Sequence, residues 1–322
     1  MASGAAGRIV RGAAWLSVAA IISLGASGLV AGASLPPTDA ARPELTARGD
    51  AAVAPGLATL RTGLIDLQGQ VSGLLGTGEQ VLVDLAAMTS DTVTATQVAD
   101  DLQEGDRELL TIETNAQALQ AAYAQLPYDA SSDHISGSTK GRLASIRQAL
   151  DTVAPVTADW QAVSTHATVA ARLFTLMRQH VAAASQAVML ASDKDASGRT
   201  KVPDLAGALA ALDQAAAILT QAGSIRDQLV PTTDMSTYDQ WVALHQAYEA
   251  ALGRYLRAAQ TTSDSRVLTP LFEQQKAAYL RLPTTTAPLV AILDDLQATG
   301  LTDGVAALQR ISASLVDLAQ VD

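Results

Sequence analysis

The sequence predicts an all-α protein, an elongated antiparallel bundle of long helices that follows an N-terminal export signal or membrane anchor. Ala, the strongest helix former, accounts for 64 of the 322 residues. Apolar residues recur at alternating spacings of three and four through most of the chain, which is the heptad pattern of packed helices. No segment alternates apolar and polar residues for long enough to predict a sheet.

The first 33 residues have the features of a segment handled by an export machinery. Arg8 and Arg11 precede a long uncharged run with an apolar centre, and a small-x-small pattern ends at Ala33. Residues 13–33 are also long enough for a single transmembrane helix. A cleaved signal peptide and a retained anchor both remain open. The first predicts secretion after cleavage near Ala33, and the second predicts a protein anchored on the extracytoplasmic side of the membrane.

Residues 34–56 contain four Pro residues among small side chains, which predicts a semi-extended Pro/Ala-rich linker. The clearest later break is a polar stretch over residues 193–203. It divides the body into a long-helix bundle over residues 57–192 and a shorter-helix bundle over residues 204–322. These form either two packed subdomains or one domain.

Each predicted helix is marked by an apolar stripe and ends at a polar or Pro-containing segment. The short polar connection after the first helix predicts that the first two helices pack antiparallel. Gly76 and Gly78 allow a break in the first helix. In the third, the stripe continues through Pro155 to Val181 and Val188, which predicts one kinked helix. The expected helices span residues 57–88, 98–126, 143–188, 205–229, 238–259, 267–282, 289–296 and 305–318.

Composition excludes several classes of function. There are 21 basic and 32 acidic residues, giving a net charge of −11, so the basic surface needed to bind nucleic acid is absent. The lack of Cys excludes disulfide frameworks and thiolate metal sites. The nucleophile and phosphate-binding motifs of common enzymes do not occur, and the sequence predicts a protein that is not an enzyme.

The twelve residues from Asp193 to Asp204 resemble an EF-hand or dockerin-type calcium loop. Oxygen-bearing side chains stand at the first, third, fifth and twelfth positions, and Gly stands at the sixth. The resemblance implies calcium as the candidate cofactor, with Asp193, Asp195, Ser197 and Asp204 as ligands. Three basic residues neutralise the loop, which favours the other interpretation: a polar turn with Asp204 at the N-cap of the next helix.

Aromatic residues gather on the predicted helix over residues 238–259. Their spacings of three, four, three and seven place them on one helix face, which indicates either the wall of a ligand pocket or a core seam. The candidate ligand-binding residues are Tyr238, Trp241, His245, Tyr248 and Tyr255.

The histidines give no transition-metal motif. His166 and His180 are fourteen residues apart on one predicted helix, about 21 Å at the helical rise, so they cannot share an ion. Neither HxxxH nor HExxH occurs in the sequence.

These observations predict an exported, membrane-associated structural or protein-interaction module of the cell envelope. Its expected partners are the membrane, through the N-terminal segment, and either an envelope protein or a second copy of the chain. The alternative is an extracytoplasmic, sensor-like domain that binds a ligand at the aromatic face.

Overall fold

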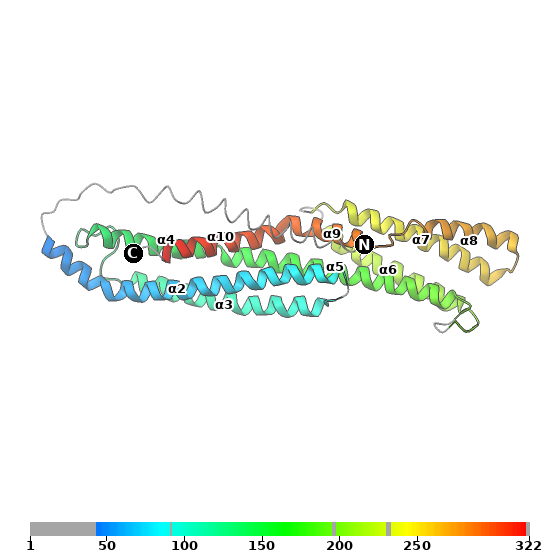
Figure 1. Cartoon of the computed structure of the whole chain (residues 1–322), viewed down its shortest axis with the longest axis horizontal. Helices are drawn as coiled ribbons and strands as arrows, with labels where there is room; N and C mark the ends of the chain where they lie inside the picture. Colours follow the sequence, from blue (N-terminus) through cyan, green and yellow to red (C-terminus); the bar gives the residue numbers. More distant parts are fainter. Residues whose placement is uncertain (1–42, 91, 195–197, 230–232, 320–322) are drawn as a thin grey trace. The chain divides into compact units, whose positions relative to one another are not determined.

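The computed structural model describes residues 43–319 except 91, 195–197 and 230–232. Within these residues the chain is helical and contains no strand, which confirms the all-α class (Figure 1). The export segment expected over residues 1–33 lies outside the described residues, as do residues 34–42. The elements in chain order are α2 (Pro43–Met88), α3 (Ala95–Ala124), α4 (Gly137–Val153), α5 (Val156–Ala191), α6 (Leu205–Leu229), α7 (Ser236–Thr261), α8 (Ser265–Tyr279), α9 (Ala287–Leu296), the π-helical turn η2 (Gln297–Leu301) and α10 (Thr302–Ala319).

Helix α2 begins earlier than expected and is unbroken. Its first residues occupy positions 43–56 of the predicted linker, so the expectation of an extended chain is wrong there. Pro43 is tolerated because the first helical residues need no intrahelical N–H donor. Pro55 lies inside the helix, where full burial of Val53 and Leu60 on the same helix offsets the lost backbone hydrogen bond. Helix α2 also passes through Gly76 and Gly78 without a break.

The predicted kinked helix around Pro155 is two helices. Helix α4 ends at Val153 and α5 starts at Val156, with Pro155 at the N-cap of α5. Pro155 has φ −77° and ψ −10°, close to helical values, so the chain direction changes little while the hydrogen-bond ladder is interrupted. The apolar register therefore continues although the helix does not.

The contacts divide the chain into two compact units, and the division differs from the one expected at residues 193–203. The larger unit contains residues 54–127 and 142–319, so most of both predicted bundles lies in it. The described part of the smaller unit contains residues 43–53 and 128–141. Within it, the Ser136 backbone N–H donates to Asp50 Oδ1 at 2.9 Å.

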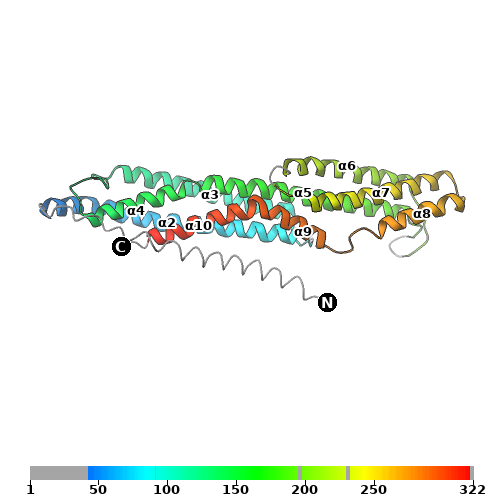
Figure 2. The same cartoon turned by 90° about the horizontal axis from the view of Figure 1, so that it is seen from above.

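Helices α2 and α3 run antiparallel in the larger unit. Asn115 donates to Gln70 at 3.0 Å, and Thr77 donates to Glu108 at 2.8 Å. Thr77 is seven residues after Gln70, whereas Glu108 is seven residues before Asn115, so the two chains run in opposite directions. Figure 2 shows α3 beside α5, and the contacts of α5 also include α6 and α10.

The buried face of α5 changes register in its second half. The predicted seam residues Val181 and Val188 are 42% and 44% exposed, while His180, Ala184 and Ala187 are buried. Here α6 packs along α5, so a different face of α5 is buried. The expectation that Val181 and Val188 belong to the core is therefore wrong, and a histidine takes the buried position.

Trp160 is the largest fully buried side chain of the core. It lies on α5, and its indole Nε1 donates to Asp106 Oδ1 of α3 at 2.8 Å. Gly105 lies directly beneath the indole, where a Cβ atom would overlap the ring. The absence of a side chain at Gly105 thus allows α3 to pack closely against Trp160.

Among the described residues, α6 alone is long and apolar enough to cross a membrane. It is also a core helix, because it contacts α5 and α7 and buries one face that includes Ala215, Leu219 and Ala222. Its composition is therefore explained by packing within the protein.

Two carboxyl groups meet between α2 and α3. Asp84 is buried and accepts a hydrogen bond from Gln80, and its other oxygen, like Oδ2 of Asp101, is buried without a hydrogen-bond partner among the described residues. Burial, followed by the interaction with Asp84, raises the pKa of Asp101 to about 6. The folded protein therefore favours a proton on Asp101 at mildly acidic pH.

We expect Asp101→Asn to gain stability relative to the wild type as the pH rises from about 4 to about 6. In this window the folded wild type binds a proton at Asp101 that the unfolded chain does not, so this group's contribution to stability falls with pH. The measurement is urea unfolding of both proteins across this pH range. Asp66→Asn, at an exposed position of α2, is the control, and an equal gain in both variants would contradict the role of the Asp84–Asp101 contact.

Candidate functional site

The predicted aromatic stripe lies on α7, and most of it is buried. Tyr238, Trp241, His245 and Tyr248 are buried, whereas Tyr255 is half-buried. Burial raises the pKa of Tyr238 to about 12, so its phenol stays neutral at physiological pH. The stripe is thus largely enclosed in the protein, and its pocket role stays a hypothesis.

The stripe has two different sets of neighbours. At its C-terminal end, the Tyr248 ring lies 5.7 Å from that of Tyr279, and the Tyr255 ring lies 5.9 Å from that of Phe272. Both of these contacts join α7 to α8. At the N-terminal end, the stripe instead meets α5.

His180 of α5 joins the N-terminal end of the stripe. Its ring lies 5.0 Å from His245 and 5.5 Å from Trp241, and Trp241 lies 4.1 Å from His245. The Tyr238 ring stacks on that of Trp241 with 6.4 Å between the ring centroids. These rings form an aromatic cluster that includes both imidazoles.

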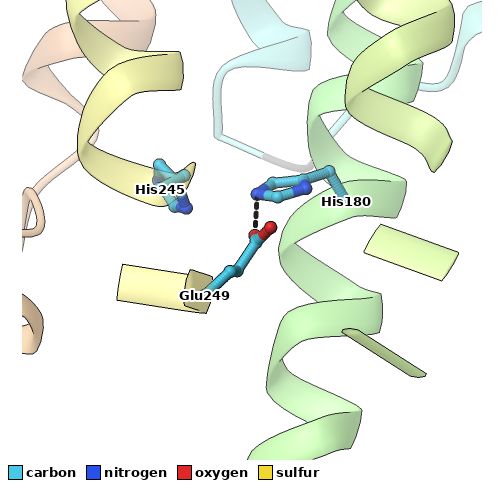
Figure 3. Close-up of side chains that lie close together, drawn as sticks. All are labelled: His180, His245 and Glu249. Atoms are coloured by element: carbon cyan, nitrogen blue, oxygen red, sulfur yellow. Dashed lines mark ion pairs between the residues drawn. The ribbon is translucent and has the colours of Figure 1, made fainter. Parts of the chain in front are cut away.

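Glu249 completes a polar cluster with the two histidines. His245 and Glu249 are four residues apart on α7 and therefore share a helix face, opposite His180 (Figure 3). His180 is fully buried, and His245 and Glu249 are each more than nine-tenths buried. Nε2 of His180 lies 3.0 Å from Oε1 of Glu249.

The other nitrogen of His180 has a backbone partner. Nδ1 lies 3.2 Å from the carbonyl oxygen of Ala215 in α6. A carbonyl oxygen only accepts hydrogen bonds, so Nδ1 carries a hydrogen. The three helices α5, α6 and α7 thus fix the ring of His180 in one orientation.

Burying this cluster costs free energy unless a positive charge is present. Burial, with a smaller effect of His180, lowers the pKa of His245 to about 4, so this imidazole is neutral at neutral pH. A buried carboxylate such as Glu249 costs several kcal/mol unless it is paired with a cation. The cluster can therefore hold a proton or a metal ion, and it can bind a small polar ligand.

Sequence reasoning identified His245 but missed the cluster. Glu249 was absent from the candidates although the spacing of His245 and Glu249 is a common arrangement of two ligands on one helix. The sequence placed His180 on the predicted helix over residues 143–188 and indicated no partner for it. His166, the other histidine of α5, is not part of the cluster and lies 2.8 Å from the Ala162 carbonyl through Nδ1.

Of the calcium-loop residues, Asp195 and Ser197 lie outside the described residues. The Asp193 carbonyl accepts a hydrogen bond from the Lys201 N–H at 2.7 Å, and Asp204 Oδ1 accepts one from the Gly207 N–H at 2.8 Å. Asp204 thus caps α6, as the turn interpretation predicted. Calcium binding by this loop stays a prediction.

Comparisons of the chain with protein-family models, curated proteins and solved structures return no match. Its function is therefore inferred from its own residues.

Proposed function

We propose that this chain is an exported, membrane-associated protein of the cell envelope that acts as a non-enzymatic structural or protein-interaction module. The N-terminal segment with Arg8 and Arg11 supports export. The interaction role is supported mainly by one observation, the apolar surface of α8.

Helix α8 has no buried residue. Its inner side, with Leu268, Leu271 and Ala278, is half-buried. The rings of Phe272 and Tyr279 also contact α7, yet Phe272 stays 45% exposed and Tyr279 stays 57% exposed. Exposed aromatic residues on one helix are typical of surfaces that bind another protein. Val267 and Leu280 extend this exposed apolar set, which we call the α8 surface.

The charge of the α8 surface indicates the chemistry of its partner. Arg266, Lys276 and Arg281 accompany a single acid, Glu273, in residues 265–281, whereas the whole chain has a net charge of −11. A locally basic apolar helix face is complementary to an acidic protein surface. We therefore infer an acidic protein partner, which a second copy of this chain can also provide.

Export is tested by intact mass measurements on membrane and soluble fractions of the native host. The proposal predicts either the full chain in membranes or a species that begins at Ser34 outside the cytoplasm. Recovery of the full chain from the cytoplasm alone would contradict export.

We expect a photoreactive amino acid at Phe272 of the full chain to cross-link in intact cells to one acidic protein or to a second copy. Adding Tyr279→Ser should reduce the yield about tenfold, because burial of an aromatic side chain supplies about 1.5–3 kcal/mol to an interface. Leu110 of α3, which is also well exposed, is the matched control position. Equal yields at Phe272 and Leu110, or adducts with lipid alone, would overturn the α8 surface as a protein interface.

The alternative, a ligand-binding sensor-like domain, is supported by the buried polar cluster beside Trp241. Any ligand in contact with His180 or His245 would lie close to the indole. It would then change Trp241 fluorescence. The Trp241→Phe variant measures the background from Trp15 and Trp160, which is subtracted from the wild-type signal. An unchanged difference spectrum with envelope metabolites would remove this alternative.

A further inference from the structure

We propose that His180, His245 and Glu249 bind one divalent transition-metal ion of the zinc class. This site is separate from the α8 surface and does not depend on the envelope role. Two imidazole nitrogens and one carboxylate oxygen are a frequent ligand set for zinc and related ions, with a further coordination position left for water or a ligand.

The positions of the ligand atoms suit one small cation. One potential ligand atom from each residue lies within 4.8 Å of the others, and the His180 and Glu249 atoms are 3.0 Å apart. A tetrahedral ion with ligands at about 2.0–2.1 Å requires separations of about 3.3 Å. The separations, from 3.0 Å to at most 4.8 Å, bracket this value, and side-chain adjustment would complete the site.

The contact between His180 and Glu249 joins two buried atoms that an ion could bind. Both His180 Nε2 and Glu249 Oε1 are buried and have no hydrogen-bond partner among the described residues, although they are 3.0 Å apart. A proton between them would align the two groups as a hydrogen bond. An ion bound by both atoms would take the place of that hydrogen bond and give each buried atom a partner.

The surroundings of His180 match those of a metal-binding histidine. Its Nδ1 hydrogen faces the Ala215 carbonyl, which leaves the Nε2 lone pair available to an ion. This arrangement of a ligand nitrogen on one side and a backbone carbonyl on the other is usual at zinc sites. Glu249 supplies one negative charge, which offsets half of the dication's charge in the protein interior.

Nitrogen ligands determine the class of ion. Imidazole favours zinc, cobalt, nickel and copper over calcium and magnesium, which prefer oxygen. The site therefore differs in its chemistry from the predicted calcium loop at Asp193 and Asp204.

The experiment uses the full chain without a polyhistidine tag, stripped of metal with a chelator and titrated with Zn²⁺ or Co²⁺. We expect one Zn²⁺ per chain, a higher unfolding temperature in its presence, and a visible Co²⁺ spectrum of a tetrahedral site. Excess Ca²⁺ should not displace either ion. A metal-free chain that binds no Zn²⁺, or a Co²⁺ spectrum that is octahedral like the free ion, would overturn the proposal.

Variants assign the ion to these residues. Glu249→Gln and His245→Gln keep side-chain size and should each weaken Zn²⁺ binding about a hundredfold or more while the far-ultraviolet circular dichroism stays helical. His166→Gln, on α5 but outside the cluster, is the matched control and should bind like the wild type. Unchanged Zn²⁺ affinity in Glu249→Gln and His245→Gln would assign the ion elsewhere and contradict the proposal. If either variant fails to fold, zinc-dependent shifts of the His180 and His245 imidazole resonances in the NMR spectrum of the wild type decide the same question, and unshifted resonances overturn the site.

Discussion

Trp160→Ala is expected to lower the free energy of unfolding by about 3–5 kcal/mol, the range for loss of a fully buried large aromatic side chain. Trp160 is completely buried between helices that include α3 and α5. Removing the indole leaves a cavity in a close-packed core, which local adjustment fills only in part. Equilibrium unfolding in urea, followed by circular dichroism, measures the loss.

Trp160→Phe separates the contribution of ring burial to stability from that of the hydrogen bond. It keeps most of the buried area and removes the donor to Asp106, so we expect a smaller loss of about 1 kcal/mol. Asp106 is exposed and can be hydrated when the indole N–H is absent. A loss in Trp160→Ala no larger than that in Trp160→Phe would show that the indole is not a principal core contact.

Gly105→Ala is expected to destabilise the protein by about 2 kcal/mol, although Ala is the better helix former. A Cβ atom at position 105 would overlap the indole of Trp160. Overpacking of this kind costs about 1–3 kcal/mol and outweighs the gain in helix propensity, because a fully buried indole has no free space to enter. The measurement is the same urea unfolding experiment.

Gly69→Ala is the matched control for Gly105→Ala. Nothing lies within 4 Å of a Cβ atom at Gly69 in α2, so this change should stabilise by about 0.5–1 kcal/mol. In the Trp160→Ala background, Gly105→Ala should also become stabilising, since the overlapping ring is gone. Destabilisation by Gly105→Ala in both backgrounds would place the cause outside the contact with Trp160.

The helices were predictable because their signals are local. The Leu residues and the Pro-containing stop define α6 from Leu205 to Leu229, and its observed bounds are the same. The prediction of an extended linker was wrong at residues 43–56 because Pro residues are helix breakers only in the local sequence. Burial of Val53 and Leu60 is a tertiary effect. The early helix start therefore could not be inferred from the local composition.

The polar cluster required information that no local pattern contains. The choice between His180 and Val181 as the buried residue depends on where α6 packs against α5, and hydrophobicity alone favours Val181. His180 and Glu249 then meet only because α5 and α7 are placed at a particular register. The aromatic stripe could be predicted from the spacing on its own helix. Its partner His180, 65 positions before His245, lies on another helix whose rotation the sequence did not define.

The position of α10 in the core has a consequence for the order in which the protein can be completed during synthesis. Ser312 of α10 lies 2.9 Å from Ser72 of α2, 240 residues earlier in the chain. Leu308 and Leu315 enter the same core as the first helices. Because translation proceeds from the N-terminus, apolar surface of α2 and α5 stays uncovered until α10 leaves the ribosome. The nascent chain therefore exposes this surface throughout the synthesis of the helices between α2 and α10, and this is the interval in which it is most prone to aggregate.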